Sequence, residues 1–170
     1  MKKFFRFLKN IWVFRKALWN FRWWDYHYTL EMMKTSLKIM SDNLETKGIE
    51  VDVPRLKKVA KMRRAIEIMN NMEGVQHIMM AEKELGELFF EPFEFKPSES
   101  HPGSYELVDN KPLEQIEHNK KVYARAREIE EQEWAELWEI FKGQDNSKYD
   151  TNKQEWNDWF DGTGMRGWWD

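Results

Sequence analysis

The sequence predicts an all-α, single-domain helical bundle of five or six helices spanning residues 1–170. Apolar residues recur every three to four positions through most of the chain, which is the period of an amphipathic helix. A chain of this length suits one hydrophobic core, and 41% hydrophobic with 34% charged residues is a globular composition. Four of the five prolines fall between residues 91 and 112, so the helical patterns on either side run almost without breakers.

The first predicted element is a basic and aromatic helix, the arm, over residues 1–24. Seven of the 27 Lys and Arg residues lie in the arm, which has no Asp or Glu, so a +7 arm precedes a body of about −10. Its apolar residues share one helix face, and Phe5, Trp12 and Trp19 widen that face along one flank. We expect a partner or a symmetry mate to cover so broad a stripe, in preference to a membrane, and we therefore expect a homo-oligomer.

Helical patterns continue through residues 25–91. Asp25 suits an N-cap before a stripe with 3-4-3-4 spacing, and Gly48 suits the position after that helix. A third helix is expected from Asp52, with Pro54 in its first turn, and Gly74 either ends or bends it. The pattern beyond Gly74 predicts a further helix that runs to residue 91.

Residues 92–112 form a Pro-rich connection that we expect to be irregular, and residues 113–143 predict one long helix with an acidic outward face. That acidic face is the obvious counterpart of the arm, which we expect to dock on it or to exchange with another protomer. The tail, residues 144–170, ends in GTGMRGWWD. This ending is too Gly-rich for a helix and too aromatic to stay in water, so we expect it to dock on the bundle.

Little in the sequence points to catalysis. There is no cysteine, which excludes disulfides and thiolate sites and fits a reducing cytosol. Phosphate-binding loops, nucleophile elbows and zinc-protease signatures are also lacking, so we predict no catalytic residue, metal site or cofactor. Three histidines have a Glu four residues away, and we interpret these pairs as solvent-facing and not as metal ligands. Basic residues interrupt every apolar run of the arm, so we expect no signal peptide or membrane span and a cytoplasmic protein.

Aromatic residues beside arginines are the remaining binding signal. Indole rings could sandwich a planar base while a guanidinium contacts a phosphate, although packing in a core or an interface is the favoured interpretation of each cluster. Nucleic acid is disfavoured because the body is net negative. The candidate ligand-binding residues are Arg22, Trp23, Trp24, Arg63, Arg64, Arg166, Trp168 and Trp169.

Several blocks together resemble a group of small, uncharacterised Trp-rich helical proteins of tailed bacteriophages: IWVFRKALWNFRWWDYHYTLEMMK, DVPRLKKVAKMRRAIEIM, EWAELWEIFKGQ and DGTGMRGWWD. The resemblance implies an accessory protein that acts on the host, for example by inhibiting or sequestering a component of antiviral defence. Our first hypothesis is therefore a non-enzymatic binding protein that captures a host protein or a nucleotide-like signal molecule in the host cytoplasm.

Two alternatives stay open. The acid-rich run from Glu128 to Glu139 is similar to the clustered Glu of all-helical nucleotide pyrophosphohydrolases, which hold magnesium around a triphosphate; only the clustering matches, and a hydrated helix face is the favoured interpretation. The second alternative is an oligomeric protein whose N-terminal helix binds a membrane surface.

Overall fold

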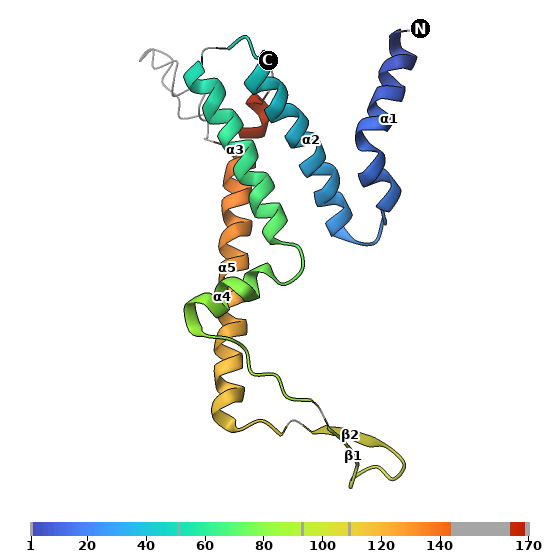
Figure 1. Cartoon of the computed structure of the whole chain (residues 1–170), viewed down its shortest axis with the longest axis vertical. Helices are drawn as coiled ribbons and strands as arrows, with labels where there is room; N and C mark the ends of the chain where they lie inside the picture. Colours follow the sequence, from blue (N-terminus) through green and yellow to red (C-terminus); the bar gives the residue numbers. More distant parts are fainter. Residues whose placement is uncertain (1, 51, 93, 109, 144–163, 169–170) are drawn as a thin grey trace. The chain divides into compact units, whose positions relative to one another are not determined.

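The predicted all-α class is confirmed by a computed structural model that describes residues 2–50, 52–92, 94–108, 110–143 and 164–168. The elements of these residues are shown in Figure 1: α1 (Lys2–Asn20), α2 (Tyr26–Lys47), α3 (Asp52–Asn71), α4 (Gln76–Leu85), β1 (Glu94–Pro97), β2 (Tyr105–Val108), α5 (Leu113–Lys142) and the 3₁₀ helix η3 (Gly164–Gly167).

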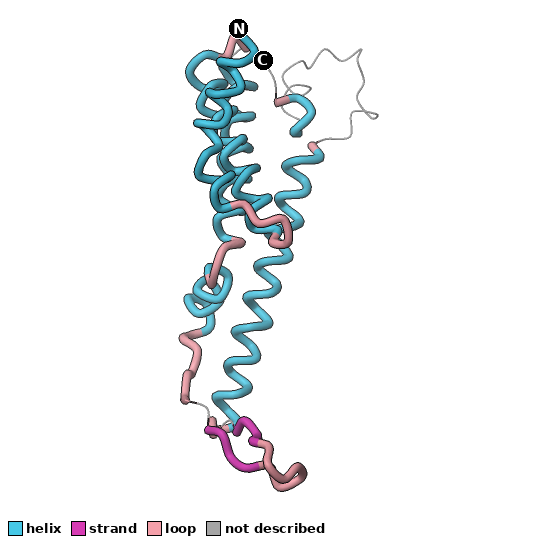
Figure 2. Tube along the Cα trace, turned by 90° about the vertical axis from the view of Figure 1, so that its right-hand side faces the viewer, coloured by secondary structure: helices cyan, strands magenta, loops and turns pink. Residues whose placement is uncertain are grey.

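The chain divides into two compact units. Unit 1 comprises residues 1–73 and 133–170, and unit 2 comprises residues 74–132. Helix α5 is continuous and contributes its C-terminal part to unit 1 and its N-terminal part to unit 2 (Figure 2). The sequence pattern predicts a single domain and gives no sign of this division, because the helical period of residues 113–143 continues unchanged across the boundary.

The core of unit 1 forms where α2 packs along α3. Helix α2 supplies Leu30, Leu37 and Leu44, which are seven residues apart and therefore lie along one side of the helix. Helix α3 supplies a wider apolar side, on which Met62 and Ile68 are fully buried. The other members are Val59, Ala65, Met69, Met72, Leu137 of α5 and Trp168 of the tail.

The two ends of α2 are closed by side chains. At its N-terminus the Asp25 carboxylate accepts a hydrogen bond from the His27 N–H at 3.0 Å, so the predicted N-cap is confirmed. At its C-terminus the Arg55 guanidinium donates to the Leu44 carbonyl at 2.8 Å. Gly48 does follow the helix, but its φ of −62° is not the left-handed conformation expected of a C′ glycine. A Cβ at Gly48 would lie 2.6 Å from Arg55 Cδ, so glycine makes room for that cap.

The tail docks on the C-terminus of α5, as predicted, through residues 164–168. Gly164 has a φ of +56°, and a Cβ there would lie 2.5 Å from the Gly143 nitrogen, so only glycine fits. This close approach carries the indole of Trp168 into the unit 1 core, where it is 3% exposed and makes an edge contact with Phe141 at 6.0 Å. The remaining residues of the predicted tail lie outside the described residues.

Unit 2 differs from the sequence prediction at two points. Helix α4 ends at Leu85 and not at residue 91, because Gly86 adopts a φ of +104° and Leu88 turns into a small core with Ala81, Val122 and Ala126. Within the connection predicted to be irregular, β1 and β2 pair antiparallel, with Glu94 opposite Val108 (Figure 2). Pro97 is the last residue of β1, Pro102 lies in the loop between the strands, and Pro92 and Pro112 lie outside the hairpin, so no proline interrupts a strand.

Replacing Trp168 with Ala should lower the free energy of unfolding by about 3–5 kcal/mol, because the change leaves a cavity in the unit 1 core. The matched control is Trp138→Ala, since Trp138 is 65% exposed and its loss should cost at most about 0.5 kcal/mol. Urea unfolding followed by circular dichroism measures both. Equal effects of the two substitutions would contradict the docked tail.

Candidate interaction surface

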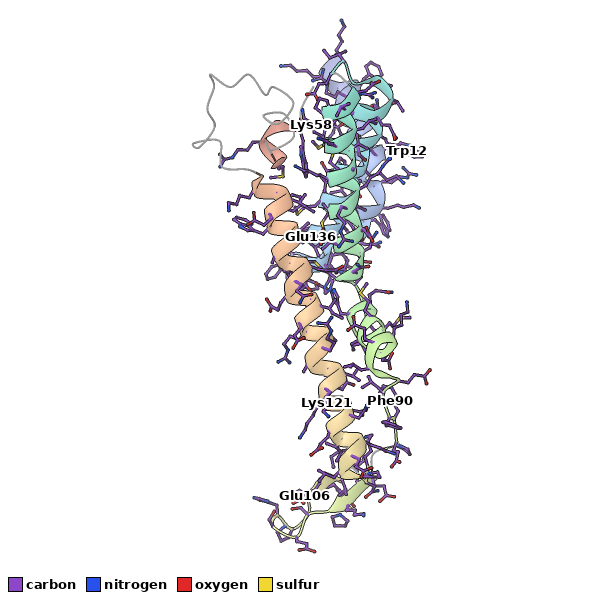
Figure 3. All side chains as sticks on the ribbon, turned by 90° about the vertical axis from the view of Figure 1, so that its left-hand side faces the viewer. Trp12, Lys58, Phe90, Glu106, Lys121 and Glu136 are labelled. Carbon is purple, nitrogen blue, oxygen red and sulfur yellow. The ribbon has the colours of Figure 1, made fainter. Side chains whose placement is uncertain are left out.

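The apolar side of α1 is uncovered in this structure. Eight of its large apolar residues are exposed, and Trp12 and Trp19 have exposed fractions of 66% and 86%. Figure 3 shows Trp12 among the side chains at the surface of unit 1. We call these eight residues the α1 face: Phe4, Phe5, Phe7, Leu8, Ile11, Trp12, Leu18 and Trp19.

Helix α1 packs on α2 through a different side. Ala17 is its one buried residue, and Val13 beside it is half-buried. Residues nine apart lie on opposite sides of a helix with 3.6 residues per turn, so Ala17 is opposite Leu8 and Val13 is opposite Phe4. The contact with α2 therefore turns the α1 face away from α2.

The basic residues of α1 have no acidic partner within the described part of the chain. Arg15 instead donates to the Trp12 carbonyl at 2.6 Å and places its guanidinium 3.9 Å from the centre of the Trp12 ring. We predicted that the arm docks on the acidic helix α5 or exchanges with another protomer. The described residues contain no ion pair between α1 and α5, and α1 packs on α2. Exchange with another protomer stays a prediction.

Three predicted ligand-binding residues occupy the turn between α1 and α2. The Asp25 N–H donates to the Arg22 carbonyl at 3.3 Å, which closes a turn that has Trp23 and Trp24 at its tip. Their rings meet edge to face with centroids 5.6 Å apart, and Trp23 is 83% exposed. The Arg22 guanidinium turns back to the Phe21 carbonyl at 3.1 Å. This turn therefore adds two exposed indoles and a guanidinium next to the α1 face.

The other predicted residues are not gathered with this turn. Arg63 forms an ion pair with Glu45, and Arg64 donates from two nitrogens to the two carboxylate oxygens of Glu136, each at 2.7 Å. Figure 3 labels Glu136 on the part of α5 that belongs to unit 1. Arg166 is exposed on η3, Trp168 is in the core, and Trp169 lies outside the described residues.

Trp168 therefore presents no open ring face to a ligand. Tyr26, which follows the Trp turn, contacts Trp134 of α5, whereas Trp168 contacts Phe141. These α5 residues are seven positions apart, or about 10 Å along the helix. The Trp23–Trp24 turn and Trp168 are thus separate in the structure.

The acidic residues of α5 form ion pairs with several basic residues. Glu128 pairs with Arg125 at 3.2 Å, Glu136 with Arg64, and Glu139 with Lys142 at 3.5 Å. In the described ranges no three acidic or histidine side chains gather as a metal ion would need. Glu133 is buried and accepts a hydrogen bond from Asn71 at 2.7 Å, which ties α5 to the end of α3.

Two of the histidines differ from the solvent-facing Glu pairs that we predicted. The Nδ1 atom of His27 lies 2.8 Å from the Asp25 carboxylate, while Glu31 pairs with Lys34. The Nε2 atom of His118 lies 3.1 Å from the Glu87 carbonyl oxygen. Both partners come from loops beside the helices, which spacing along one helix does not reveal.

Unit 2 contains an open groove of about 360 Å³ that sequence reasoning missed. Phe89, Phe90 and Tyr123 line it, together with Lys111 and Lys120. The amide of Asn119 shapes it by bonding both the N–H and the carbonyl of Phe89, at 3.0 and 2.9 Å. The groove arises because α4 ends at Leu85. It was missed because the sequence predicts that this helix continues to residue 91.

No protein-family model, curated protein or solved structure matches the chain. Among the described helices, none is long and apolar enough to cross a membrane.

Replacing Glu136 with Gln should lower the free energy of unfolding by about 1 kcal/mol near pH 7, a small value because the Arg64 pair is partly solvated. The Arg64 hydrogen bonds hold the pKa of Glu136 below its usual range. This stabilisation is therefore complete above the unfolded-state pKa of about 4.3 and is lost as the pH falls through the lower folded-state pKa.

Urea unfolding at a series of pH values measures this difference, with Glu131→Gln as the control at an exposed position of α5. The two variants should converge in acid. A Glu136→Gln deficit that stays constant down to the lowest pH at which the protein folds would contradict the role given to Arg64.

Proposed function

We propose that the protein is a non-enzymatic binding protein that engages its partner with the α1 face and the adjoining Trp23–Trp24 turn. The observation that carries this proposal is the size of the uncovered apolar surface. An aromatic side chain offers 150–250 Å², so the eight exposed aromatic residues between Phe4 and Trp24 leave on the order of 1,000 Å² in contact with water.

That area exceeds what folded monomers usually tolerate. The largest apolar patch on a typical monomer is about 300–600 Å², whereas one side of a standard protein interface buries about 800 Å². Trp and Arg are also the residues most enriched at the energetic centres of interfaces. The composition and the extent of the surface both support a docking role.

The resemblance to phage accessory proteins supports a partner in the host, and inhibition or sequestration of a defence component is the form of the proposal that it favours. A nucleotide-like signal molecule is the less favoured partner. Arg63 and Arg64 form ion pairs with carboxylates and Trp168 is buried. Of the predicted ligand-binding Trp residues that the structure describes, only those of the Trp23–Trp24 turn have rings on which a base could stack.

A photo-crosslinking amino acid at position 12 should yield an adduct in cells, because Trp12 is an exposed member of the α1 face. The same amino acid at position 138 is the matched control, since Trp138 is equally exposed but lies on α5. Mass spectrometry of the purified chain identifies the adduct. Equal yields at both positions, or none at position 12, would contradict a docking role for α1.

A further inference from the structure

We propose that the α1 face docks on the surface of an anionic lipid bilayer, with α1 lying in the plane of that surface. This inference rests on the docking role proposed above for the α1 face, and it takes a lipid surface in place of a host protein as the partner. It is argued from the order of the side chains around α1 and from the sign of their charge.

Three bands follow one another around α1. Ile11, Leu18 and Leu8 lie on the apolar side of α1, and Trp12 and Trp19 lie on its flank. Beyond that flank come Lys9 and Lys16, which follow Phe5 and Trp12 by four residues. Around the helix, aliphatic side chains are thus followed by indoles and then by ammonium groups. A bilayer surface has the matching order of acyl chains, interface and anionic headgroups.

Arg15 is the one cation within the apolar arc. Arg15 lies between Phe4 and Leu8 on the helix, and its guanidinium stacks over the Trp12 ring, which directs the charge toward the Trp flank. The Trp23–Trp24 turn follows α1 with two more exposed indoles. Indole rings combine an apolar body with a polar N–H and concentrate at membrane interfaces.

A second copy of the chain is a poorer occupant. Two α1 faces packed together would juxtapose two helices that carry only positive charge, and like charges at contact distance repel. The acidic face of α5 is already engaged in part by Arg64, Arg125 and Lys142. A bilayer with anionic lipids supplies negative charge and apolar depth together along the whole helix, about 28 Å for 19 residues.

The contact of α1 with the bundle is compatible with this docking. Ala17 and Val13 face α2, on the side opposite Leu8 and Phe4, so the α1 face can enter the lipid surface without separating α1 from α2. The acidic body would be repelled by the same surface, and at physiological ionic strength counterions screen that repulsion beyond a Debye length of about 8 Å.

The full chain should float with vesicles of equal parts phosphatidylcholine and phosphatidylglycerol at low salt, bind much less at high salt, and stay behind with phosphatidylcholine alone. Lys9→Gln with Lys16→Gln should weaken binding by about 30-fold, taking roughly fivefold for each cation lost. Ile11→Asn with Leu18→Asn should abolish flotation. Leu107→Asn, at an exposed position of β2, is the matched control and should leave binding unchanged.

Circular dichroism and the urea midpoint establish that each variant is folded. No flotation of the wild type at low salt overturns the lipid assignment. If position 12 still crosslinks to a protein, the proposed function stands without this inference; if it crosslinks to nothing, both fail. An oligomer that Ile11→Asn with Leu18→Asn dissociates would assign the α1 face to a second copy and would likewise overturn the lipid assignment.

Discussion

The packing of α2 on α3 is the contact on which the rest of unit 1 depends. Helix α2 offers one stripe, Leu30, Leu37 and Leu44, which packs with residues of α3 and with Leu137 and Trp168. On the opposite side of α2, Tyr28, Met32 and Ile39 are half-buried. Helix α1 contacts α2 through the small Ala17 and leaves its own aromatic side uncovered.

Polar contacts reinforce this arrangement around the core. Lys34 is buried and pairs with Glu31 and Glu73, and Lys58 is buried beside Glu50. Breaking such a pair leaves an uncompensated buried charge, which costs more than the intact pair contributes. These contacts hold the ends of α2 and α3 in register while α1 stays outside the network.

The helices of the fold were predictable because their apolar periods are long and regular, as in residues 30–44 and 113–143. The Asp25 N-cap and the docking of the tail were also predictable, because each depends on the residue types in a short stretch of sequence. The end of α4 was not predictable, since Phe89 continues the helical period past Gly86 and only the φ of that glycine breaks it. The site was predicted in part: the broad α1 stripe and the need for a partner to cover it were recognised, but the packing of α1 on α2 was not, because periodicity shows which residues share a face and does not show what they contact. The pairing of Arg63 and Arg64 with distant carboxylates was equally hidden.

The most direct test of this account asks whether the α1 face is uncovered in the purified protein. The chain has no cysteine, so a single introduced thiol reports on one position. Maleimide labelling of Trp12→Cys should proceed close to its rate in the unfolded chain, whereas Ala17→Cys, on the side that packs against α2, should be protected. Protection at position 12 equal to that at position 17 would contradict the account, because it would mean that the protein itself covers the aromatic side of α1.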